Sequence, residues 1–342
     1  MRTTFTRRHF LSNASLVALA PAVPAFLSRA ARAETPNDNG RILVVIQLDG
    51  GNDGINTVVS YRDEAYAKHR KTLRLRPDAV IKLNDDIALH PSMRAAADLL
   101  ADGRLAIVQG AGYPNPSRSH EVSMNIWQTA RPRSFAEESF GWIGRSTDAM
   151  KQPADGSPSS ILFGSESPPI ALQAHKSTSV AMAHLRDLQR TDDSAAIVPA
   201  NAESDDLRAF VQRTTLDAYA AADLLRDVST ADSLAAYPSF QLAQRMYMIA
   251  QLIKSGFATP VYYTIHAGFD THYVQLETHA SLLYQLSASL KAFLEDLRAA
   301  KLDDRVLVLC FSEFGRRVEE NASQGTDHGT AGPMFLAGTS VR

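Results

Sequence analysis

The sequence predicts an α/β fold in which a mostly parallel central sheet is flanked by helices and carries a helical insertion. Its apolar, β-rich runs are continuous rather than alternating, which is typical of strands buried on both faces of a parallel sheet. Strand-like and helix-like segments alternate along the chain on either side of a middle region of different composition. With 342 residues, 45% of them hydrophobic, the chain can fill a substantial core.

The N-terminus has the features of an export signal. Thr6–Leu11 reads TRRHFL, in which paired arginines are followed by large apolar residues. A weakly apolar stretch, Ala14–Leu27, leads to the small-x-small cleavage site Ala31–Ala33. We expect residues 1–33 to be a twin-arginine signal peptide that engages the twin-arginine translocase. The mature domain, residues 34–342, is then expected to be periplasmic or secreted.

Composition excludes several classes of function. The formal net charge of -2 argues against a nucleic-acid-binding surface, which needs a strong basic excess. The single cysteine, Cys310, cannot form an internal disulfide, and its place in an apolar run predicts a small core residue. No mature segment is long and apolar enough to span a membrane. Since the twin-arginine route carries folded proteins, often with a cofactor already inserted, a metal site is worth seeking.

The elements of the N-terminal part follow one another in a regular order. Arg41–Leu48 (RILVVIQL) is a predicted buried strand that ends in a glycine-rich loop. Pro91–Asp102 has a helical pattern, and Leu105–Val108 is a second strand closed by glycines. Ser119–Gln128 has the apolar spacing of a helix. These segments supply the first strand–helix alternation of the fold.

The middle region, about residues 150–256, is expected to be an insertion or cap. Residues 150–200 are rich in Ser, Ala, Pro and Asp, with short strand candidates at Ile161–Phe163 and Ser179–Met182. Residues 204–256 are predicted to be mostly helical, because glycine is absent there until Gly256.

Strand and helix alternate again in the C-terminal part. Val261–His266 and Val306–Phe311 are predicted strands, and Ser281–Ala300 between them is a predicted helix. Met334–Ala337 is a last predicted strand, close to the end of the sequence.

Polar side chains with ligand chemistry fall next to the strands. In open α/β sheets, ligands bind beyond the carboxyl ends of the strands, so these residues are expected to meet at one edge. Carboxylates and imidazoles are ligands for zinc, manganese or a similar divalent ion. The candidates are Asp49, Asp270, His272, Glu313, Asp327 and His328, with Ser117, Arg118, Ser119 and His120 in the loop and helix start after the second strand.

Each candidate also has an ordinary structural explanation. Asp49 in a glycine-rich loop can be a turn residue, and His328 can be a cap. Glu313 can pair with Arg316 or Arg317. Their joint placement at successive strand ends favours a site. Three other histidines lie outside this pattern and are expected to be structural: His90, His266 and His279.

The serine candidates leave two roles open. Ser119 precedes a predicted helix, so it can be the N-cap. It can equally be a nucleophile at a helix N-terminus, where backbone N–H groups favour a bound anion. Ser117 is the competing nucleophile, and Arg118 either binds an anionic substrate or lies in solvent.

Five motifs together resemble an exported bacterial family, the domain-of-unknown-function family 1501. They are LDGGNDG (48–54), SRSH with WQTA (117–120 and 127–130), GFDTH (268–272), SEFGR (312–316) and GTDHGTAGP (325–333). The resemblance covers essentially the whole mature chain. It implies a relation to the alkaline phosphatase and sulfatase superfamily. The implied fold is alkaline phosphatase-like, with one or two divalent metals, such as zinc, at the strand ends.

The resemblance also implies roles for individual residues. Asp49 matches the aspartate after the first strand, and Ser119, or Ser117, falls at the place of the nucleophile. One metal would be held by Asp270, His272 and His328. Asp327 would be a ligand or would orient His328. Arg118 would help to bind a small anionic ester.

The second metal site of the superfamily is incomplete in this sequence. Glu313 falls where an aspartate of that site belongs, but Phe314 stands where a histidine should follow. The alternatives are a single metal, an altered second site, or a site without catalysis. The resemblance also implies that relatives continue beyond Arg342, so we expect the sequence to be truncated there.

Two hypotheses of function follow. The first is a metal-dependent hydrolase of phosphate or sulfate esters, and the second is a non-catalytic envelope protein that binds a ligand or partner. A redox role is disfavoured by the single cysteine and because LDGGNDG is not the G-x-G-x-x-G dinucleotide fingerprint.

Overall fold

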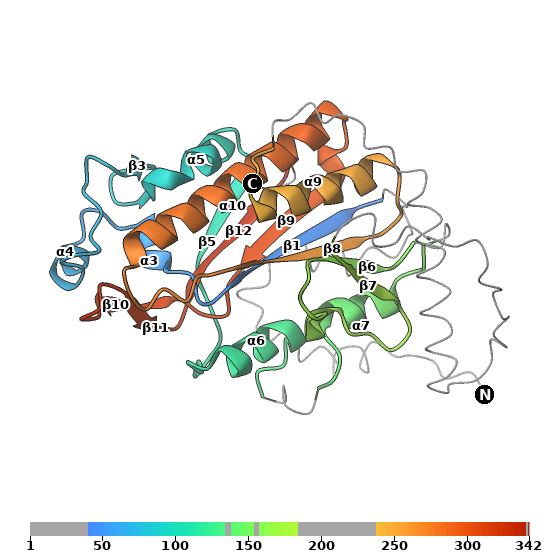
Figure 1. Ribbon diagram of the computed structural model, residues 1–342, viewed down its shortest axis with the longest axis horizontal. Coiled ribbons are helices and arrows are strands. Elements are labelled where there is room, and N and C mark those ends of the chain that lie inside the picture. The colour runs from blue at the N-terminus through green and yellow to red at the C-terminus, as the bar shows by residue number, and fades with distance from the viewer. Residues whose placement is uncertain (1–39, 134–137, 154–156, 184–236, 340, 342) are drawn as a thin grey trace, which may run out of the picture.

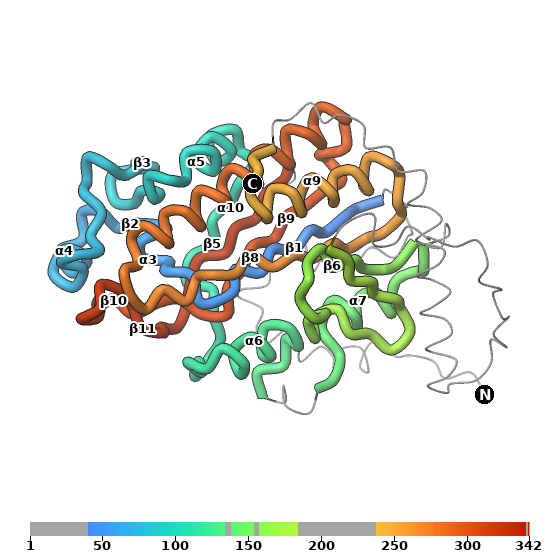
Figure 2. The backbone as a smooth tube through the Cα atoms, viewed as in Figure 1, coloured from blue at the N-terminus to red at the C-terminus, as the bar shows by residue number. Residues whose placement is uncertain are grey.

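The computed structural model describes residues 40–133, 138–153, 157–183, 237–339 and 341. A seven-stranded sheet crosses the molecule in the order β5-β12-β9-β1-β8-β6-β7 (Figure 1). Its strands are β1 (Ile42–Asp49), β5 (Leu105–Ala111), β6 (Ser160–Phe163), β7 (Ser179–Met182), β8 (Val261–Ala267), β9 (Val306–Phe311) and β12 (Gly332–Ala337). Figure 2 shows how β1, from the start of the described chain, lies between β8 and β9 from its C-terminal part.

The sheet is mostly parallel, as predicted. β1 pairs in parallel with β8 and β9, and β6 pairs in parallel with β7 and β8. β12 is the exception, because it runs antiparallel to both of its neighbours, β9 and β5. The direction of β12 matters for the site. A strand that runs the opposite way begins at the edge where the parallel strands end, so the segment before β12 reaches the carboxyl edge of the sheet.

Helices cover both faces of the sheet (Figure 1). α5 (Arg94–Ala101), α9 (Gln241–Lys254) and α10 (Gln275–Ala299) lie on one face, and α6 (His120–Thr129) and α7 (Trp142–Ala149) lie on the other. Shorter elements complete the described fold. They are α3 (Gly54–Thr57), α4 (Glu64–His69), β2 (Val58–Val59), β3 (Ile81–Lys82), β4 (Ala88–Leu89), β10 (Arg316–Glu320), β11 (Thr326–His328) and the 3₁₀ turns Pro91–Met93, Ile170–Leu172 and Asp303–Arg305.

The first strand shows why its apolar run is continuous. Val44, Ile46 and Leu48 pack into the core under α9 and α10, whereas Val45 packs into the core under α6 and α7. Successive side chains of a strand point to opposite faces, so a strand covered on both faces must be apolar at every position. Cys310 in β9 is a buried core residue, as predicted, and burial raises the pKa of its thiol.

Most predicted elements are present with small shifts at their ends. The predicted helix at Ser281–Ala300 begins earlier, at Gln275. Its start lacks a sequence signal, because Val274 precedes it in a left-handed conformation (φ 42°) and no side chain caps the helix. Of the predicted helical stretch 204–256, α9 is described. Residues 204–236 of that stretch, and the predicted signal peptide at residues 1–33, lie outside the described residues. Within the described ranges, no helix combines the length and apolar character needed to cross a membrane.

A buried ion pair fixes the loop after β1. Asp53 and Arg70 are both fully buried, and two guanidinium nitrogens donate to the carboxylate at 2.6 and 3.0 Å. Gln275, at the start of α10, donates to the same carboxylate at 2.5 Å. Burial raises the pKa of Asp53, but the Arg70 guanidinium outweighs that effect and leaves this pKa below its ordinary value. The pair therefore joins the loop after β1 to α4 and α10.

The three histidines expected to be structural are buried. His266 Nε2 lies 3.1 Å from the carbonyl of Leu282, and His279 Nε2 lies 3.0 Å from Asn52 Oδ1. His90 Nδ1 accepts a hydrogen bond from the backbone N–H of Ser92. Burial lowers the pKa of His90 to about 3 and the pKa values of His266 and His279 to about 4, so these rings are neutral in the folded protein near pH 7.

The first prediction concerns the Asp53–Arg70 pair. We expect Asp53→Asn to lower the free energy of unfolding by about 3–5 kcal/mol, because it leaves the Arg70 charge buried without its partner. Urea denaturation followed by circular dichroism measures the change. Asp78→Asn, in the exposed Arg76–Asp78 pair, is the matched control and should leave the urea midpoint unchanged. Equal effects of the two substitutions would contradict this assignment.

The second prediction concerns pH. The folded-state pKa of His279 (about 4) lies below its ordinary value of 6.5. The unfolded chain therefore binds more protons between these values, so stability falls as the pH drops from 6.5 to 4. We expect His279 to contribute about 3 kcal/mol to this fall. Melting temperatures measured from pH 7 to 4 should decline less steeply in His279→Gln than in the wild type. Ser281→Ala, at an exposed position of the same helix that carries no titrating group, should leave the slope unchanged.

Candidate metal centre

Four loops and the start of one helix meet at the carboxyl edge of the sheet. They follow β1, β8 and β9, precede β12, and lead into α6. The close approach of these loops requires glycine at two positions. Gly50 has φ 118° and a side chain there would collide with the backbone of Asp270, and Gly51 (φ 82°) lies against the ring of Phe314. The LDGG sequence therefore allows the loop after β1 to pack directly beneath the site residues.

Three ligand-type atoms meet at this edge. Asp270 Oδ1 lies 3.0 Å from His272 Nε2 and 3.1 Å from His328 Nε2, and the two imidazole nitrogens are 2.9 Å apart. Two ligands bound to one zinc ion at about 2 Å are separated by at most about 4 Å. The three atoms thus lie within the reach of a single ion.

The other ring nitrogens indicate which imidazole atoms are free to bind. His328 Nδ1 lies 2.7 Å from the carbonyl of Arg118, which can only accept, so Nδ1 carries the proton and Nε2 has a lone pair. His272 Nδ1 lies 3.5 Å from Asp327 Oδ1. His272 Nε2 also faces an Arg316 N–H at 3.4 Å, and that group can only donate. The contacts therefore assign a lone pair to Nε2 of both rings, as in metal-binding histidines held by a carboxylate or carbonyl.

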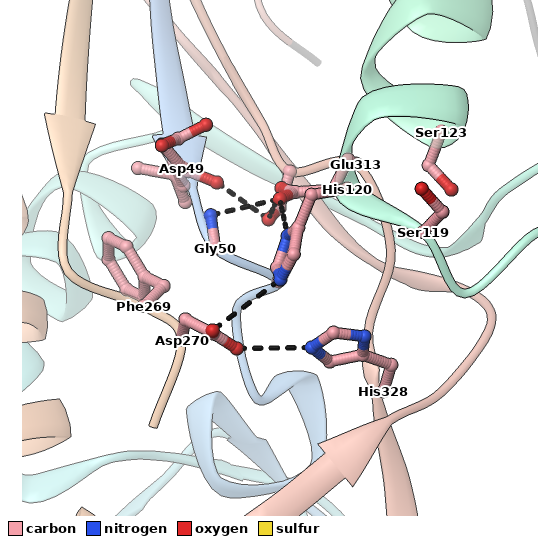
Figure 3. Close-up of polar contacts among 12 residues, drawn as sticks. Asp49, Gly50, Ser119, His120, Ser123, Phe269, Asp270, Glu313 and His328 are labelled. Atoms are coloured by element: carbon pink, nitrogen blue, oxygen red, sulfur yellow. Dashed lines mark hydrogen bonds and ion pairs between the residues drawn. The ribbon is translucent and has the colours of Figure 1, made fainter. Parts of the chain in front are cut away.

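His120 and Glu313 form a second pair beside these atoms (Figure 3). His120 is the first residue of α6, and its Nδ1 lies 2.8 Å from Glu313 Oε1. Its Nε2 points toward Asp270 and lies 3.5 Å from Oδ2. Donor atoms of His120, Asp270 and His328 all lie within 4.8 Å of one another, so His120 borders the same space.

Arg316 lies beneath the cluster with its guanidinium fully buried. It donates to Asp270 Oδ1 at 2.6 Å. It also donates to four backbone carbonyls, those of Gly50, Gly51, Phe269 and Thr326. Burial raises the pKa of Asp270, but the hydrogen bond and the charge of the Arg316 guanidinium outweigh that effect and this pKa falls to about 2, so this carboxylate stays ionised.

The remaining predicted ligands occupy different environments. Asp49 is half-buried at the end of β1, where burial and then the Glu313 carboxylate raise its pKa. Asp327 lies beside His272, although it was expected to orient His328. Glu313 contacts His120 and neither of the arginines proposed as its partners. Phe314 is buried and its ring lies 5.0 Å from that of His120 and 4.6 Å from that of His328, so it forms an apolar wall of the site.

The serine candidates lie at the start of α6. Ser119 is the N-cap, with its Oγ 3.5 Å from the backbone nitrogen of Val122, and Figure 3 shows it apart from the imidazoles and carboxylates. Ser117 Oγ accepts from the backbone nitrogen of Ser119. Arg118 is exposed, and its carbonyl rather than its guanidinium contacts His328. The structural role expected for Ser119 is therefore present, and the nucleophilic role stays a prediction.

The sequence named two further residues of this centre without predicting what they do there: His120 had no individual role, and Arg316 was considered only as a partner of Glu313. The signal for His120 was its place in the sequence: it lies at the start of the predicted helix Ser119–Gln128, which follows the predicted strand Leu105–Val108. Arg316 had no comparable signal, because its role depends on carbonyl groups from loops far apart in the sequence.

Comparison with solved structures gives weak similarities. The C-terminal periplasmic domain of EcEptC from Escherichia coli, in a complex with Zn, is 8% identical over 88% of this chain and 73% of its own, with a TM-score of 0.38. A protein in the alkaline phosphatase superfamily from Vibrio parahaemolyticus is 10% identical over 88% of this chain and 61% of its own, with a TM-score of 0.35. A comparison with curated proteins gives no match.

The comparison with sequence families is decisive about membership. Residues 41–342 match the family described as protein of unknown function (DUF1501), which spans every strand and helix described above. The chain belongs to this family, as the five motifs of its sequence predict.

Proposed function

We propose that this protein binds a divalent cation through Asp270, His272 and His328 and is an exported hydrolase of phosphate or sulfate esters. One observation carries the proposal. Three electron-rich atoms, one carboxylate oxygen and two imidazole nitrogens, lie 2.9–3.1 Å from one another. Their mutual repulsion is relieved when a cation binds to all three.

The residues present fit such an ion. Two imidazoles and one carboxylate form a common catalytic zinc set, in which the fourth position is left for water or substrate. When bound, the ion would supply Lewis acidity and lower the pKa of a coordinated oxygen. Zinc or manganese suits these ligands. The partners of the Nδ1 atoms, Asp327 for His272 and the Arg118 carbonyl for His328, would keep both rings oriented.

The chain's own groups around this position suit a small anionic ester. Arg118 is exposed at the start of α6, and the N-terminus of this ten-residue helix favours negative charge. His120, held by Glu313, presents Nε2 on the same side. Ser119 is the proposed nucleophile, with Ser117 as the alternative. A coordinated water takes that role if neither serine is required.

A second candidate function is ligand binding without turnover. Two observations favour it: Phe314 packs as a wall where the superfamily pattern has a histidine, and the Ser119 hydroxyl has an N-cap role. An assay of substrate turnover distinguishes the two functions. Both require an intact ligand site, but only the hydrolase gives turnover.

Export through the twin-arginine translocase to the periplasm, or beyond it, is also proposed, on the Arg7–Arg8 pair and the Ala31–Ala33 cleavage site. The route suits a protein that acquires its metal and folds before export.

The third prediction tests the cation. We expect the purified wild-type chain to retain zinc or manganese in elemental analysis and to melt at a higher temperature with metal than after chelation, because an ion that binds only the folded state stabilises it. Asp270→Asn and His328→Ala should each abolish retention and the thermal shift. His175→Ala, at an exposed histidine outside the cluster, is the control. Metal-free wild-type protein with no thermal shift would contradict the proposal.

The fourth prediction concerns the nucleophile. Ser119→Gly removes the hydroxyl at the cost of only a few tenths of a kcal/mol in N-cap stability, so it separates chemistry from folding. In assays with aryl phosphates and aryl sulfates we expect metal-dependent turnover in the wild type. Turnover should fall at least about 100-fold in Ser119→Gly and persist in Ser117→Ala. Equal turnover in Ser119→Gly and wild type would exclude Ser119, and metal binding without turnover in the wild type would favour the second function.

A further inference from the structure

Three carboxylates surround one imidazole at the edge of the site. Asp49, Asp270 and Glu313 come from the ends of three neighbouring strands, and the ring of His120 lies among them (Figure 3). His120 Nδ1 is 2.8 Å from Glu313 Oε1, and its Nε2 is 3.5 Å from Asp270 Oδ2. The imidazole therefore connects two carboxylates that could otherwise share an ion.

The oxygens of Glu313 already have partners. Oε1 accepts from the backbone N–H of Gly50 and contacts His120, and Oε2 lies 2.9 Å from the Ser312 hydroxyl, whose proton it shares with the carbonyl of Leu48. The Glu313 side chain is fully buried. In this arrangement Glu313 holds His120 in place and is not free to be a metal ligand.

The oxygens of Asp270 are divided in the same way. Oδ1 meets His272, His328 and the buried Arg316 guanidinium. Oδ2 faces His120. A second ion bridged by Asp270 would have to take the place that the His120 ring occupies.

We infer that the site holds one divalent ion, and that the His120 imidazole, held by Glu313, fills the position beside Asp270 where a second ion would bind. This inference rests on the proposed cation at Asp270, His272 and His328. It assigns Glu313 to positioning His120 and leaves Asp49 without an ion in the wild-type protein.

The number of bound ions tests the inference directly. Native mass spectrometry and elemental analysis should give one Zn²⁺ per wild-type chain. His120→Ala should give two, because it removes the ring that lies between Asp49, Glu313 and Asp270 Oδ2. Alanine is well tolerated at this position, the first residue of α6, and the His120 side chain is 40% exposed, so the variant should fold. Circular dichroism and a thermal melt check folding.

A double variant identifies the second ion's ligands. Asp49→Asn combined with His120→Ala should return the count to one, and Asp49→Asn alone should also give one. Replacing Glu121, the neighbouring exposed residue of α6, by Ala controls for changes to the helix and should give one.

The outcomes separate this inference from the proposed function. A wild-type chain that binds no Zn²⁺ overturns the proposed function and the inference with it. Two ions in the wild type overturn only the inference. A count of one ion in His120→Ala shows that the imidazole does not exclude a second ion. A count of zero in this variant shows that His120 is itself a ligand. Either result overturns the inference.

Discussion

The buried guanidinium of Arg316 is the interaction on which the edge of the sheet depends. Its donors reach backbone carbonyls in the loop after β1, the loop after β8 and the segment before β12, and one donor reaches Asp270. Buried carbonyls need partners, and arginine stays charged under all ordinary conditions and has five donors in a fixed plane. A single side chain therefore sets how closely three loops approach and how the Asp270 carboxylate is oriented. Gly50 and Gly51 allow the same close approach of the loops, because side chains at these positions would collide with neighbouring loops.

The position of Arg316 also determines the charge of the centre. Asp270 shares its negative charge with a cation that is already present in the fold, so its carboxylate is ionised even in acid. A divalent ion bound to Asp270 and two neutral imidazoles would add two positive charges to a group that Arg316 has already neutralised. The group formed by Asp270, Arg316 and the ion would then carry a net positive charge, which attracts anions, while the carboxylates of Asp49, Glu313 and Asp327 lie close to it. This local positive charge supports the proposed anionic ester as substrate and the inferred exclusion of a second ion next to Asp270.

Much of the fold could be predicted because its signals are local. A strand covered on both faces is apolar throughout, as in β1, and the residues after parallel strands must meet at one edge. That rule places Asp270 and His272 at this edge, whereas His328 reaches it because β12 runs antiparallel. The partners within the cluster could not be predicted, because they depend on how side chains cross between loops. The position of Asp327 beside His272 and the contact of Glu313 with His120 depend on the antiparallel direction of β12 and on how α6 packs against the sheet, and the sequence specifies neither.

Phe314 illustrates the difference between a motif and a site. In the sequence, the residue after Glu313 is not the histidine that the resemblance implied, so a potential ligand is missing there. In space, an imidazole is present beside Glu313, but it comes from His120 at the start of α6. Phe314 packs against that ring and against His328, so the apolar side chain restricts how both imidazoles can turn. Phe314 thus offers no ligand atom and helps to fix the orientation of two rings. An apolar wall with no ligand atom and two imidazoles held in place suits the single ion that we infer for this centre.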